Sequence, residues 1–504
     1  MNIKVCANQF CKKEFETTDF DVVFYQKMDV LEPKICPDCR QQRRLSFRNE
    51  RKLYHNTCGL CRKTFVSIYS PDKPFTVYCA ACWWGDGWDP LAFGREFDFS
   101  RPFFEQFAEV WKRVPKLGFL SLGDSTNSDY CNDAAHLLNC YLIFDGDQAR
   151  DCYYGESFAN ITDCCDFLFL QRSELCYECT NCNDCYNLNF SRHCNNCSDS
   201  NFLVDCRNCR NCFGCINLEQ QEYCIFNKQY SAEEYAKIVS SFYLDNYDEL
   251  QKIKKQCADF FQKFPRKLVH GIMNENVTGD NLNHCKDTFE SYDCANLQDC
   301  KFCTNMLIGA TDCYDINIWG DNMSRCYNCA CVGLGAQDIV GSYYCGFGGN
   351  NIFHSTYCLH NVENLFGCDG LKYKKFCILN MQYLEGEYRM LVPKIIAHMK
   401  STGEWGVFFP PQISAFGYNE TVANEYYSLT KEVALAQGFR WYDPDPKEYQ
   451  KPHDDILACE VCAKNFKIAK PELIFYQKKN LPHPRKCPDC RHVDRLNLRG
   501  PRRL

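Results

Sequence analysis

Twelve cysteines near the two ends of the chain occur as close pairs, a pattern typical of metal-binding thiolates. Two thiolates on a tight turn can share one ion, and a second pair farther along the chain completes a tetrahedron around Zn²⁺. Four cysteines leave no open position on the metal, so the predicted role is structural. We predict about three zinc ions per chain, held by Cys6, Cys11, Cys36 and Cys39, by Cys58, Cys61, Cys79 and Cys82, and by Cys459, Cys462, Cys487 and Cys490.

The first and last of these segments are copies of each other. Cys11-Lys-Lys-Glu-Phe15 matches Cys462-Ala-Lys-Asn-Phe466, and Cys36-Pro-Asp-Cys39-Arg40 matches Cys487-Pro-Asp-Cys490-Arg491 at the same offset. Such self-similarity indicates an internal duplication. The proline after the first cysteine of the second pair suits the first turn of a helix. A hairpin followed by a ligand-bearing helix predicts a treble-clef-like module, with a plain zinc ribbon as the alternative.

Arginines recur every three or four residues along each predicted ligand-bearing helix, which places them on one face. They are Arg40, Arg44, Arg48 and Arg51 in the first copy and Arg491, Arg495, Arg499 and Arg502 in the last. We favour a phosphate-binding face for RNA or a ribonucleoprotein, because guanidinium groups form forked hydrogen bonds with phosphate oxygens. Two alternatives stay open: a solvated helix face, and docking of the arginines onto the acidic middle of the same chain.

That middle is rich in cysteine and consists of two related blocks. The chain has 504 residues, 41 cysteines and a net charge of −7, yet residues 124–230 alone carry −10 and residues 280–384 carry −5. Cys224-Ile-Phe-Asn227 in the first block reappears as Cys377-Ile-Leu-Asn380 in the second. Cysteines of the first block recur at every twelfth position, as Cys140, Cys152 and Cys164 do, with short strand-like stretches between them. A fixed short period of this kind predicts a duplicated β-solenoid that resembles a parallel β-helix.

The role of the central cysteines follows from comparing the two blocks. The runs Cys176/Cys179/Cys182/Cys185 and Cys206/Cys209/Cys212/Cys215 are dense enough for an iron–sulfur cluster. However, Cys206, Cys209 and Cys212 correspond to Leu359, Val362 and Leu365 within a preserved frame. Leucine cannot replace a ligand, but it can replace a buried free cysteine, which behaves as a small apolar residue. We therefore favour buried ladders of thiols, with central zinc sites and an iron–sulfur or thiol redox protein as alternatives.

The predicted fold is mainly β with helices: a duplicated cysteine-rich β-solenoid flanked by small zinc-ribbon or treble-clef domains. Ser231-Ala-Glu-Glu234 is a capping box that opens a connecting helix. The segments are module 1 (1–52), module 2 with a connecting helix (53–118), copy 1 of the solenoid (119–230), a helical connector (231–270), copy 2 (271–384), a helix with an aromatic and proline-rich arm (385–452), and module 3 (453–504).

The pattern resembles uncharacterised cysteine-rich zinc-ribbon proteins encoded by genome-reduced environmental bacteria. The motifs that carry this resemblance are Cys36-Pro-Asp-Cys39-Arg40, Ser70-Pro-Asp-Lys-Pro74, Phe97-Asp-Phe-Ser-Arg-Pro-Phe-Phe-Glu-Gln-Phe107, Phe226-Asn-Lys-Gln-Tyr230 and Phe416-Gly-Tyr-Asn-Glu-Thr421. The resemblance implies zinc binding and brings no assigned activity.

The remaining expectations follow from composition. No apolar run approaches the roughly 20 residues of a membrane helix, and the N-terminus lacks the apolar core of a secretory signal, so we predict a cytoplasmic protein without a membrane partner. In a reducing compartment a disulfide framework is not expected. No paired catalytic carboxylates, phosphate loop or Ser/His/Asp order indicates an enzyme or a small-molecule substrate. We predict a non-enzymatic zinc scaffold, with a self-docked structural protein as one alternative; the oligomeric state is left open.

Overall fold

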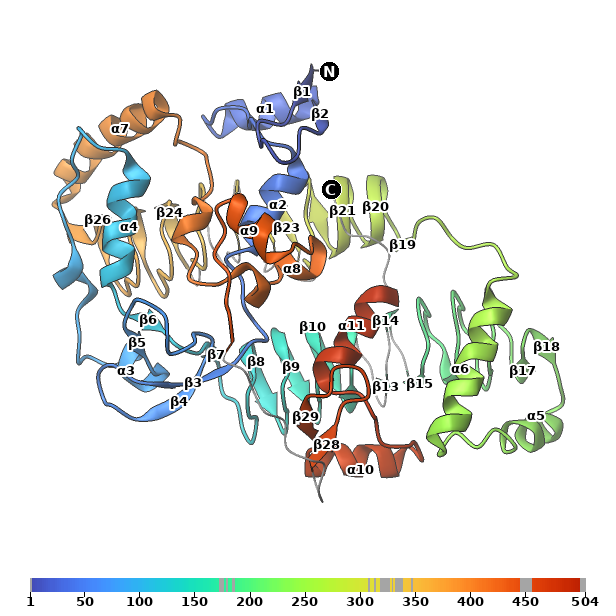
Figure 1. Cartoon of the computed structure of the whole chain (residues 1–504). Helices are drawn as coiled ribbons and strands as arrows, with labels where there is room; N and C mark the ends of the chain where they lie inside the picture. Colours follow the sequence, from blue (N-terminus) through green and yellow to red (C-terminus); the bar gives the residue numbers. More distant parts are fainter. Residues whose placement is uncertain are drawn as a thin grey trace. The chain divides into compact units, whose positions relative to one another are not determined.

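The structure is a computed structural model that describes residues 2–171, 176–177, 180–183, 186–306, 309–311, 314–317, 327–328, 330, 339–345, 348–444 and 456–498. It divides into two compact units (Figure 1). The first unit contains residues 1–119 and 271–443, and the second contains residues 120–270 and 444–500. Modules 1 and 2 therefore belong with copy 2 of the solenoid, whereas module 3 belongs with copy 1.

Copy 1 is a parallel solenoid whose strands pair with the strand one turn later. The register joins Asn132 to Phe144, and Phe144 to Glu156, so that each turn advances the chain by twelve positions. The two parallel sheets run in the orders β14-β12-β10-β9-β8-β7 and β11-β13-β15-β16. The strands are β7 (Ser121–Leu122), β8 (Asn132–Leu138), β9 (Phe144–Arg150), β10 (Glu156–Thr162), β11 (Cys164–Cys165), β12 (Leu168–Gln171), β13 (Cys176–Tyr177), β14 (Thr180–Asn183), β15 (Tyr186–Asn189) and β16 (Ser198–Asn201), followed by the antiparallel pair β17 (Cys224–Ile225) and β18 (Lys228–Gln229). The predicted solenoid and its period are confirmed.

Each turn is made of three-residue steps with a bend at every step. Left-handed backbone recurs at every third residue, for example at Asp133, His136 and Asn139, with φ values of 57°, 52° and 56°. Asn and Asp are frequent at these bends because they tolerate this conformation better than most residues. The residue that follows a bend points into the core, as Leu137 and Cys140 do. The two-residue alternation of an ordinary strand therefore does not apply, and the central cysteines sit directly after corners.

Copy 2 differs from copy 1 because its middle turns are one residue longer. Lys301 pairs with Tyr314, and Tyr343 pairs with Thr356, so the partner in each case lies thirteen positions later. The extra residue appears in the spacing of the described bends: left-handed Asn305 and Gly309 are four positions apart, as are Tyr344 and Gly348. The strands are β19 (Gly271–Ile272), β20 (Glu275–Asn283), β21 (Lys286–Ala295), β22 (Leu297–Gln298), β23 (Ala310–Thr311), β24 (Asn350–Phe353), β25 (Glu363–Phe366) and β26 (Lys375–Ile378), and β27 (Met381–Gln382) closes the copy as an antiparallel partner of β26.

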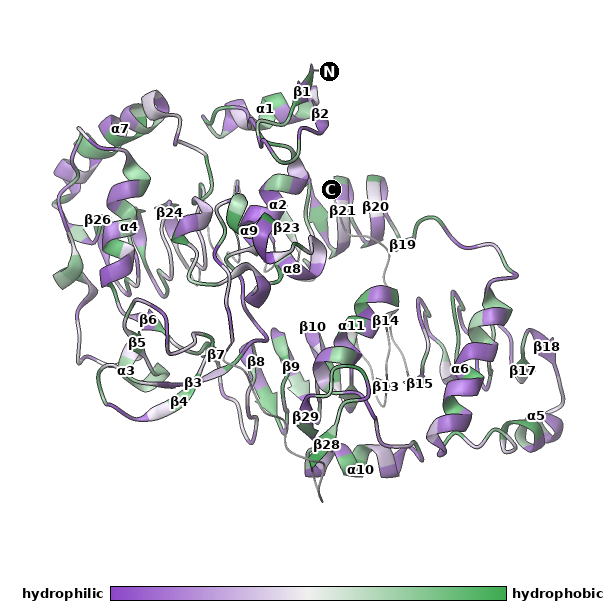
Figure 2. Ribbon diagram, in the orientation of Figure 1, coloured by the Kyte–Doolittle hydropathy of each residue, from purple (hydrophilic) through white to green (hydrophobic). Residues whose placement is uncertain are grey.

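Amphipathic helices cover the solenoids, and Figure 2 shows α4 and α6 carrying both apolar and polar residues. In the second unit, α5 (Ala232–Val239) begins at the predicted capping box of Ser231, and α6 (Tyr247–Phe261) follows. Tyr235 and Ile253 pack with Phe213 and Ile225 at the end of copy 1. In the first unit, α4 (Phe103–Arg113) packs on copy 2, with the rings of Phe103 and Phe366 5.5 Å apart.

Further helices of the first unit lie in the segment after copy 2. Helix α7 (Glu385–Thr402) continues through Pro393 and ends at Gly403, whose backbone is left-handed. The short elements η2 (Pro411–Ile413), η3 (Tyr418–Glu420), α8 (Ala423–Tyr426) and α9 (Lys431–Ala436) form the aromatic arm. Over the described residues, no helix combines the length and apolar character that crossing a membrane requires.

Candidate metal centres and their docking contacts

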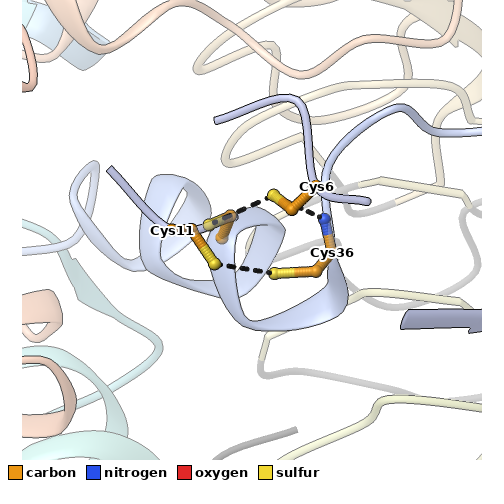
Figure 3. Close-up of side chains that lie close together, drawn as sticks. Cys6, Cys11 and Cys36 are labelled. Carbon is orange, nitrogen blue, oxygen red and sulfur yellow. Dashed lines mark hydrogen bonds between the residues drawn. The ribbon is translucent and has the colours of Figure 1, made fainter. Parts of the chain in front are cut away.

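The structure brings together all three predicted sets of four cysteines. In each set the four Sγ atoms lie within 4.8 Å of one another. Figure 3 shows the side chains of Cys6, Cys11 and Cys36 pointing toward one another in module 1. The cysteines whose side chains are described are free thiols, so these clusters are not disulfides.

The sulfur spacing fits a tetrahedral zinc site. Zinc–thiolate bonds of about 2.3 Å in a tetrahedron place neighbouring sulfurs about 3.8 Å apart. The Sγ atoms of Cys6 and Cys39 are 3.8 Å apart, and those of Cys11 and Cys36 are 3.7 Å apart. The corresponding distances are 3.9 Å for Cys61 and Cys79 and 3.6 Å for Cys462 and Cys487. All three groups can therefore hold a metal ion through thiolates alone.

The same local structure builds each site. A hairpin carries the first cysteine pair, between β1 (Asn2–Val5) and β2 (Glu14–Thr17), β3 (Tyr54–Thr57) and β4 (Thr64–Ser67), or β28 (Ile456–Ala458) and β29 (Asn465–Lys467). The second pair lies at the start of α2 (Pro37–Leu45), α3 (Ala80–Trp84) or α11 (Pro488–Leu498). Between hairpin and ligand-bearing helix, modules 1 and 3 insert α1 (Asp19–Lys27) and α10 (Lys470–Lys478), and module 2 inserts β5 (Val77–Tyr78). This is the treble-clef-like arrangement.

Backbone amides and helix ends favour thiolate at these sites. The backbone N–H of Cys36 donates to Sγ of Cys6 at 3.3 Å, and Nδ2 of Asn8 donates to Sγ of Cys39 at 3.3 Å. Hydrogen bonding with the Cys39 thiol lowers the pKa of Cys36 to about 5 and raises that of Cys39, so the first thiolate of this set forms at Cys36. The positive end of the helix dipole acts in the same direction. Such contacts orient ligands and stabilise their charged form.

The arginine stripe of module 1 faces copy 2 and not solvent. Nε of Arg40 donates to Oδ2 of Asp315 at 2.5 Å, and Nη1 of Arg44 lies 3.4 Å from Oδ1 of the same carboxylate. The side chains of Arg40 and Arg44 are 3% and 0% exposed, and Asp315 is fully buried at a left-handed corner of the solenoid. Arg44 also donates to Oδ1 of Asn317 at 2.8 Å. The two guanidinium groups therefore share one buried acceptor.

Module 3 makes the equivalent contact with copy 1. Nη1 of Arg491 donates to Oδ2 of Asp166 at 2.5 Å, and Nη1 of Arg495 lies 2.9 Å from Oδ1. Asp166 is also a fully buried, left-handed corner residue. Arg491 and Arg495 are the duplicates of Arg40 and Arg44, so both modules dock through the same pair of positions. We call each set of two arginines and one aspartate a latch.

An aromatic ring one turn before the aspartate completes each latch. The guanidinium carbon of Arg40 lies 5.3 Å from the ring centroid of Phe302, and that of Arg491 lies 4.7 Å from the ring of Tyr154. Phe302 precedes Asp315 by one of the longer turns of copy 2, and Tyr154 precedes Asp166 by one turn of copy 1. Cation–π contacts strengthen when they are removed from water, as here.

A second matched position lies on the helix before the ligand-bearing helix. Asp21 in α1 accepts hydrogen bonds from the ammonium of Lys301 and the hydroxyl of Tyr314, each at 2.9 Å. Its duplicate Glu472 in α10 accepts from the hydroxyl of Tyr154 at 2.7 Å. Both carboxylates are buried. The duplication therefore includes the docking contacts as well as the metal ligands.

The other members of the arginine stripes are placed differently. Arg48 is buried and pairs with Glu50 inside module 1, while Arg51 is half-buried. Arg499 and Arg502 lie outside the described residues. For Arg40, Arg44, Arg48, Arg491 and Arg495 the phosphate-facing arrangement that we favoured from the sequence is therefore not the one found. The observed packing is what the docking alternative predicts, because a phosphate cannot reach these groups while the modules stay docked.

Module 2 docks on copy 2 by different chemistry. The ammonium of Lys372 lies 4.9 Å from the Trp83 ring centroid, 5.5 Å from that of Trp88 and 5.7 Å from that of Trp84. Trp83 is fully buried and Trp84 and Trp88 are half-buried, so the Lys372 side chain packs against all three rings. Next to the module, Lys116 of β6 (Lys116–Leu117) forms a buried ion pair with Asp369.

The central thiols whose side chains are described line the solenoid cores. The Sγ of Cys152 donates to the carbonyl oxygen of Arg150 at 3.1 Å, and Cys209 donates to Arg207 in the same way at 3.3 Å. Serines at equivalent positions make the same bond, as the hydroxyl of Ser200 does with the Ser198 carbonyl at 2.7 Å. Desolvation by burial raises the pKa of thiols such as Cys131 and Cys377 to about 12. Hydrogen bonds between neighbouring thiols lower the pKa of Cys209 and raise that of Cys212. The burial and these hydrogen bonds support packing thiols.

The structure does not describe the side chains of one central run, Cys176/Cys179/Cys182/Cys185. Metal binding by this run therefore lies outside the described residues. The run Cys206/Cys209/Cys212/Cys215 is described and is buried in the core of copy 1. It is not among the groups of three or more donor atoms close enough to share one ion, in the part of the chain that the structure describes. The packing interpretation is therefore supported for this second run.

We expect Cys209→Ser to fold with an unchanged metal content. The serine hydroxyl can keep the hydrogen bond to the Arg207 carbonyl, as the Ser200 hydroxyl does with the Ser198 carbonyl, so the substitution leaves no buried polar group unpaired. Thermal unfolding and elemental analysis of the purified variant measure both quantities. Loss of one metal ion from Cys209→Ser would show that the central thiols are ligands.

Sequence reasoning found the cysteine sets but missed the acceptors that hold modules 1 and 3 in place. Asp166 and Asp315 are two charged residues among many in the solenoid, and their burial depends on tertiary packing. One signal was available: Tyr154 with Asp166 and Phe302 with Asp315 repeat an aromatic residue followed, one turn later, by aspartate. That pairing becomes visible only when the longer turns of copy 2 are known.

Comparisons with known proteins leave the family of the chain open. No family model matches the chain, and no curated protein matches it. Among solved structures, an acetyltransferase candidate from Desulfovibrio desulfuricans G20 is 8% identical, with 50% of this chain and 68% of that chain covered. Its TM-score of 0.11 is too low to support any argument about fold or activity. The resemblance to cysteine-rich zinc-ribbon proteins stays a prediction.

Proposed function

We propose that the chain is a non-enzymatic scaffold in which structural zinc folds small modules that latch onto a duplicated β-solenoid. The observation that carries this proposal is the repeated latch, in which two arginines of each terminal module meet one buried aspartate of a solenoid copy. A zinc ion bound by four thiolates supplies folding energy and no open coordination position. We therefore propose that the zinc sites keep the modules folded, so that each module presents a surface of fixed structure.

An RNA or ribonucleoprotein partner remains a separate prediction within this proposal. The latch arginines would have to leave the solenoid before they could bind phosphate. The two roles of the arginines therefore predict opposite results in solution, and one set of variants distinguishes them.

We expect the protein to show no RNA binding through the latch arginines at moderate salt. Arg40→Gln combined with Arg44→Gln should instead make module 1 more sensitive to limited proteolysis, because Asp315 then lacks its cationic partners. Arg62→Gln, which changes an exposed arginine of module 2, serves as the control. Gel-shift titrations over a series of salt concentrations provide the second measurement.

The contrary result is RNA binding that weakens steeply with salt and is reduced by the double substitution but not by Arg62→Gln. Each phosphate contact adds about 0.7–0.9 to the log–log slope of affinity against salt. If the double substitution lowered this slope by the amount expected for one or two lost phosphate contacts and left protease resistance unchanged, the arginines would be assigned to phosphate binding. That result would overturn the latch.

A further inference from the structure

A cavity of about 220 Å³ lies in the first unit, where module 1 meets the segment that follows α7. Leu31, Trp405, Val407 and Phe408 supply apolar surface to it, and Arg43 lies in the same lining. Glu32, the acidic residue of the lining, is paired with Lys4. Leu31 and Val407 are 51% and 36% exposed, so the cavity has an apolar rim that solvent can reach. Apolar walls with a few polar groups are typical of small-molecule sites.

Arg43 differs from the arginines on either side of it along α2. Arg40 and Arg44 meet Asp315, whereas Arg43 has neither an ion pair nor a side-chain hydrogen bond anywhere in the described part of the chain. It is half-buried beside apolar walls. Lys34, also in the lining, is likewise without a salt bridge to any described residue. A guanidinium held in partly desolvated surroundings without an acceptor gains from a carboxylate that enters beside it.

The duplication shows that the zinc site does not require this arginine. A tetrathiolate zinc site carries excess negative charge, and the thiols of Cys39 and Cys6 act electrostatically on Arg43. Compensation of that charge is therefore the alternative role. However, the residue at the equivalent position of module 3 is Asp494, whose carboxylate pairs with Lys486 at 2.8 Å. Module 3 builds the same cysteine cluster with the opposite charge at this position. The charge of Arg43 is therefore better explained by the cavity.

The volume limits the size of the ligand. At about 30 Å³ per water molecule, the cavity has room for about seven waters. A ligand that fills it therefore has at least about seven non-hydrogen atoms. A single forked guanidinium suits the two oxygens of one carboxylate. We propose that this cavity binds a small organic monocarboxylate with an aromatic or branched apolar body, whose carboxylate pairs with Arg43 and whose body lies against Trp405 and Phe408. This site is additional to the scaffold role.

The test uses the full-length, metal-loaded protein and calorimetric titration with benzoate as the probe. We expect benzoate to bind at least tenfold more tightly than benzyl alcohol, which lacks the charge, and than acetate, which lacks the ring. Arg43→Gln should weaken benzoate binding at least tenfold, and Arg62→Gln should leave it unchanged. Equal binding of benzoate and benzyl alcohol, or undiminished binding by Arg43→Gln, would overturn the assignment. Preference for phenyl phosphate over benzoate by tenfold or more would overturn the carboxylate as the ligand.

A second variant keeps the test valid if Arg43→Gln also loses metal. Val407→Trp adds bulk at the rim and changes neither Arg43 nor any cysteine. We expect it to abolish benzoate binding while elemental analysis shows the metal content of the parent protein. Benzoate affinity that survives Val407→Trp would place the ligand elsewhere and refute the site.

Discussion

Removal of the metal from the full-length protein is expected to unfold the three zinc modules and to leave the solenoids folded. The apolar cluster around the cysteines of module 1 consists mainly of the ligands themselves: Cys6, Cys36 and Cys39 are buried, and Cys11, Phe15 and Ile35 pack against them. A core of this size cannot hold a module of about 50 residues together without a metal or other cross-link. Structural zinc contributes about 10–16 kcal/mol in small fingers.

The solenoid cores respond differently because they are continuous stacks of buried side chains. Leu188, Ile161 and Phe158 share one cluster with the thiols of copy 1, and Ile339, Ile352 and Leu365 do so in copy 2. A chelator has no ion to remove from these clusters if the thiols only pack. The β signal in circular dichroism should therefore persist after chelation, while limited proteolysis should release fragments from residues 1–118 and 453–504.

Matched variants make this prediction specific. Elemental analysis should find about three zinc ions in the parent protein and one fewer in Cys36→Ser, whose module 1 should become protease-sensitive. Cys257→Ser changes a buried cysteine of α6 that belongs to no cysteine cluster and is the control. Fewer than two zinc ions, or substantial iron with visible absorbance, would contradict the assignment. So would modules that stay protease-resistant after chelation.

The metal centres could be predicted from sequence because residue type and spacing alone specify them. Local structure brings together the cysteines in the hairpin turn and those at the start of the helix. The duplicated modules 1 and 3 repeat this arrangement at a fixed offset in the sequence. The period of copy 1 was visible for the same reason, since Cys140, Cys152 and Cys164 mark one column of the core.

The remaining features depend on geometry that the residue pattern does not reveal. The three-residue step arises from left-handed bends, and residues as different as Asp133, His136 and Leu142 occupy them. The longer turns of copy 2 also change the meaning of the comparison between copies. Leu359 pairs with Lys372, thirteen positions later, so the leucine that replaces Cys206 begins a longer turn. Leu365, which replaces Cys212, pairs with Cys377, twelve positions later as in copy 1.

Docking was the least predictable feature because it depends on which charges become buried. The sequence predicts that Arg40 and Arg491 lie on matching helix faces. It leaves open whether those faces meet phosphate, solvent or the acidic middle of the chain. The structure supplies the missing partners, Asp315 and Asp166, at equivalent corners of two different solenoid copies. A row of arginines in a chain that also contains an acidic repeat can thus form ion pairs within the chain and need not bind a partner.

Asp315→Asn is expected to detach module 1 from copy 2 and to lower the stability of the first unit. Asparagine tolerates the left-handed backbone of this corner, so the substitution removes the charge without straining the chain. Arg40 and Arg44 then remain buried without their counter-ion, and breaking a buried ion pair from one side costs about 3–5 kcal/mol. Thermal unfolding and limited proteolysis near residues 45–55 should report the loss.

Asp299→Asn is the matched control, because Asp299 occupies another left-handed corner of copy 2 and forms no ion pair with a described residue. Asp166→Asn should reproduce the effect in the second unit by loosening module 3. Adding Arg40→Gln and Arg44→Gln to Asp315→Asn should recover part of the loss, since no uncompensated charge then remains buried. Equal stability of Asp315→Asn and Asp299→Asn would show that the aspartate does not hold the module. An additive triple variant, with no recovery, would show that the three groups do not act as one latch.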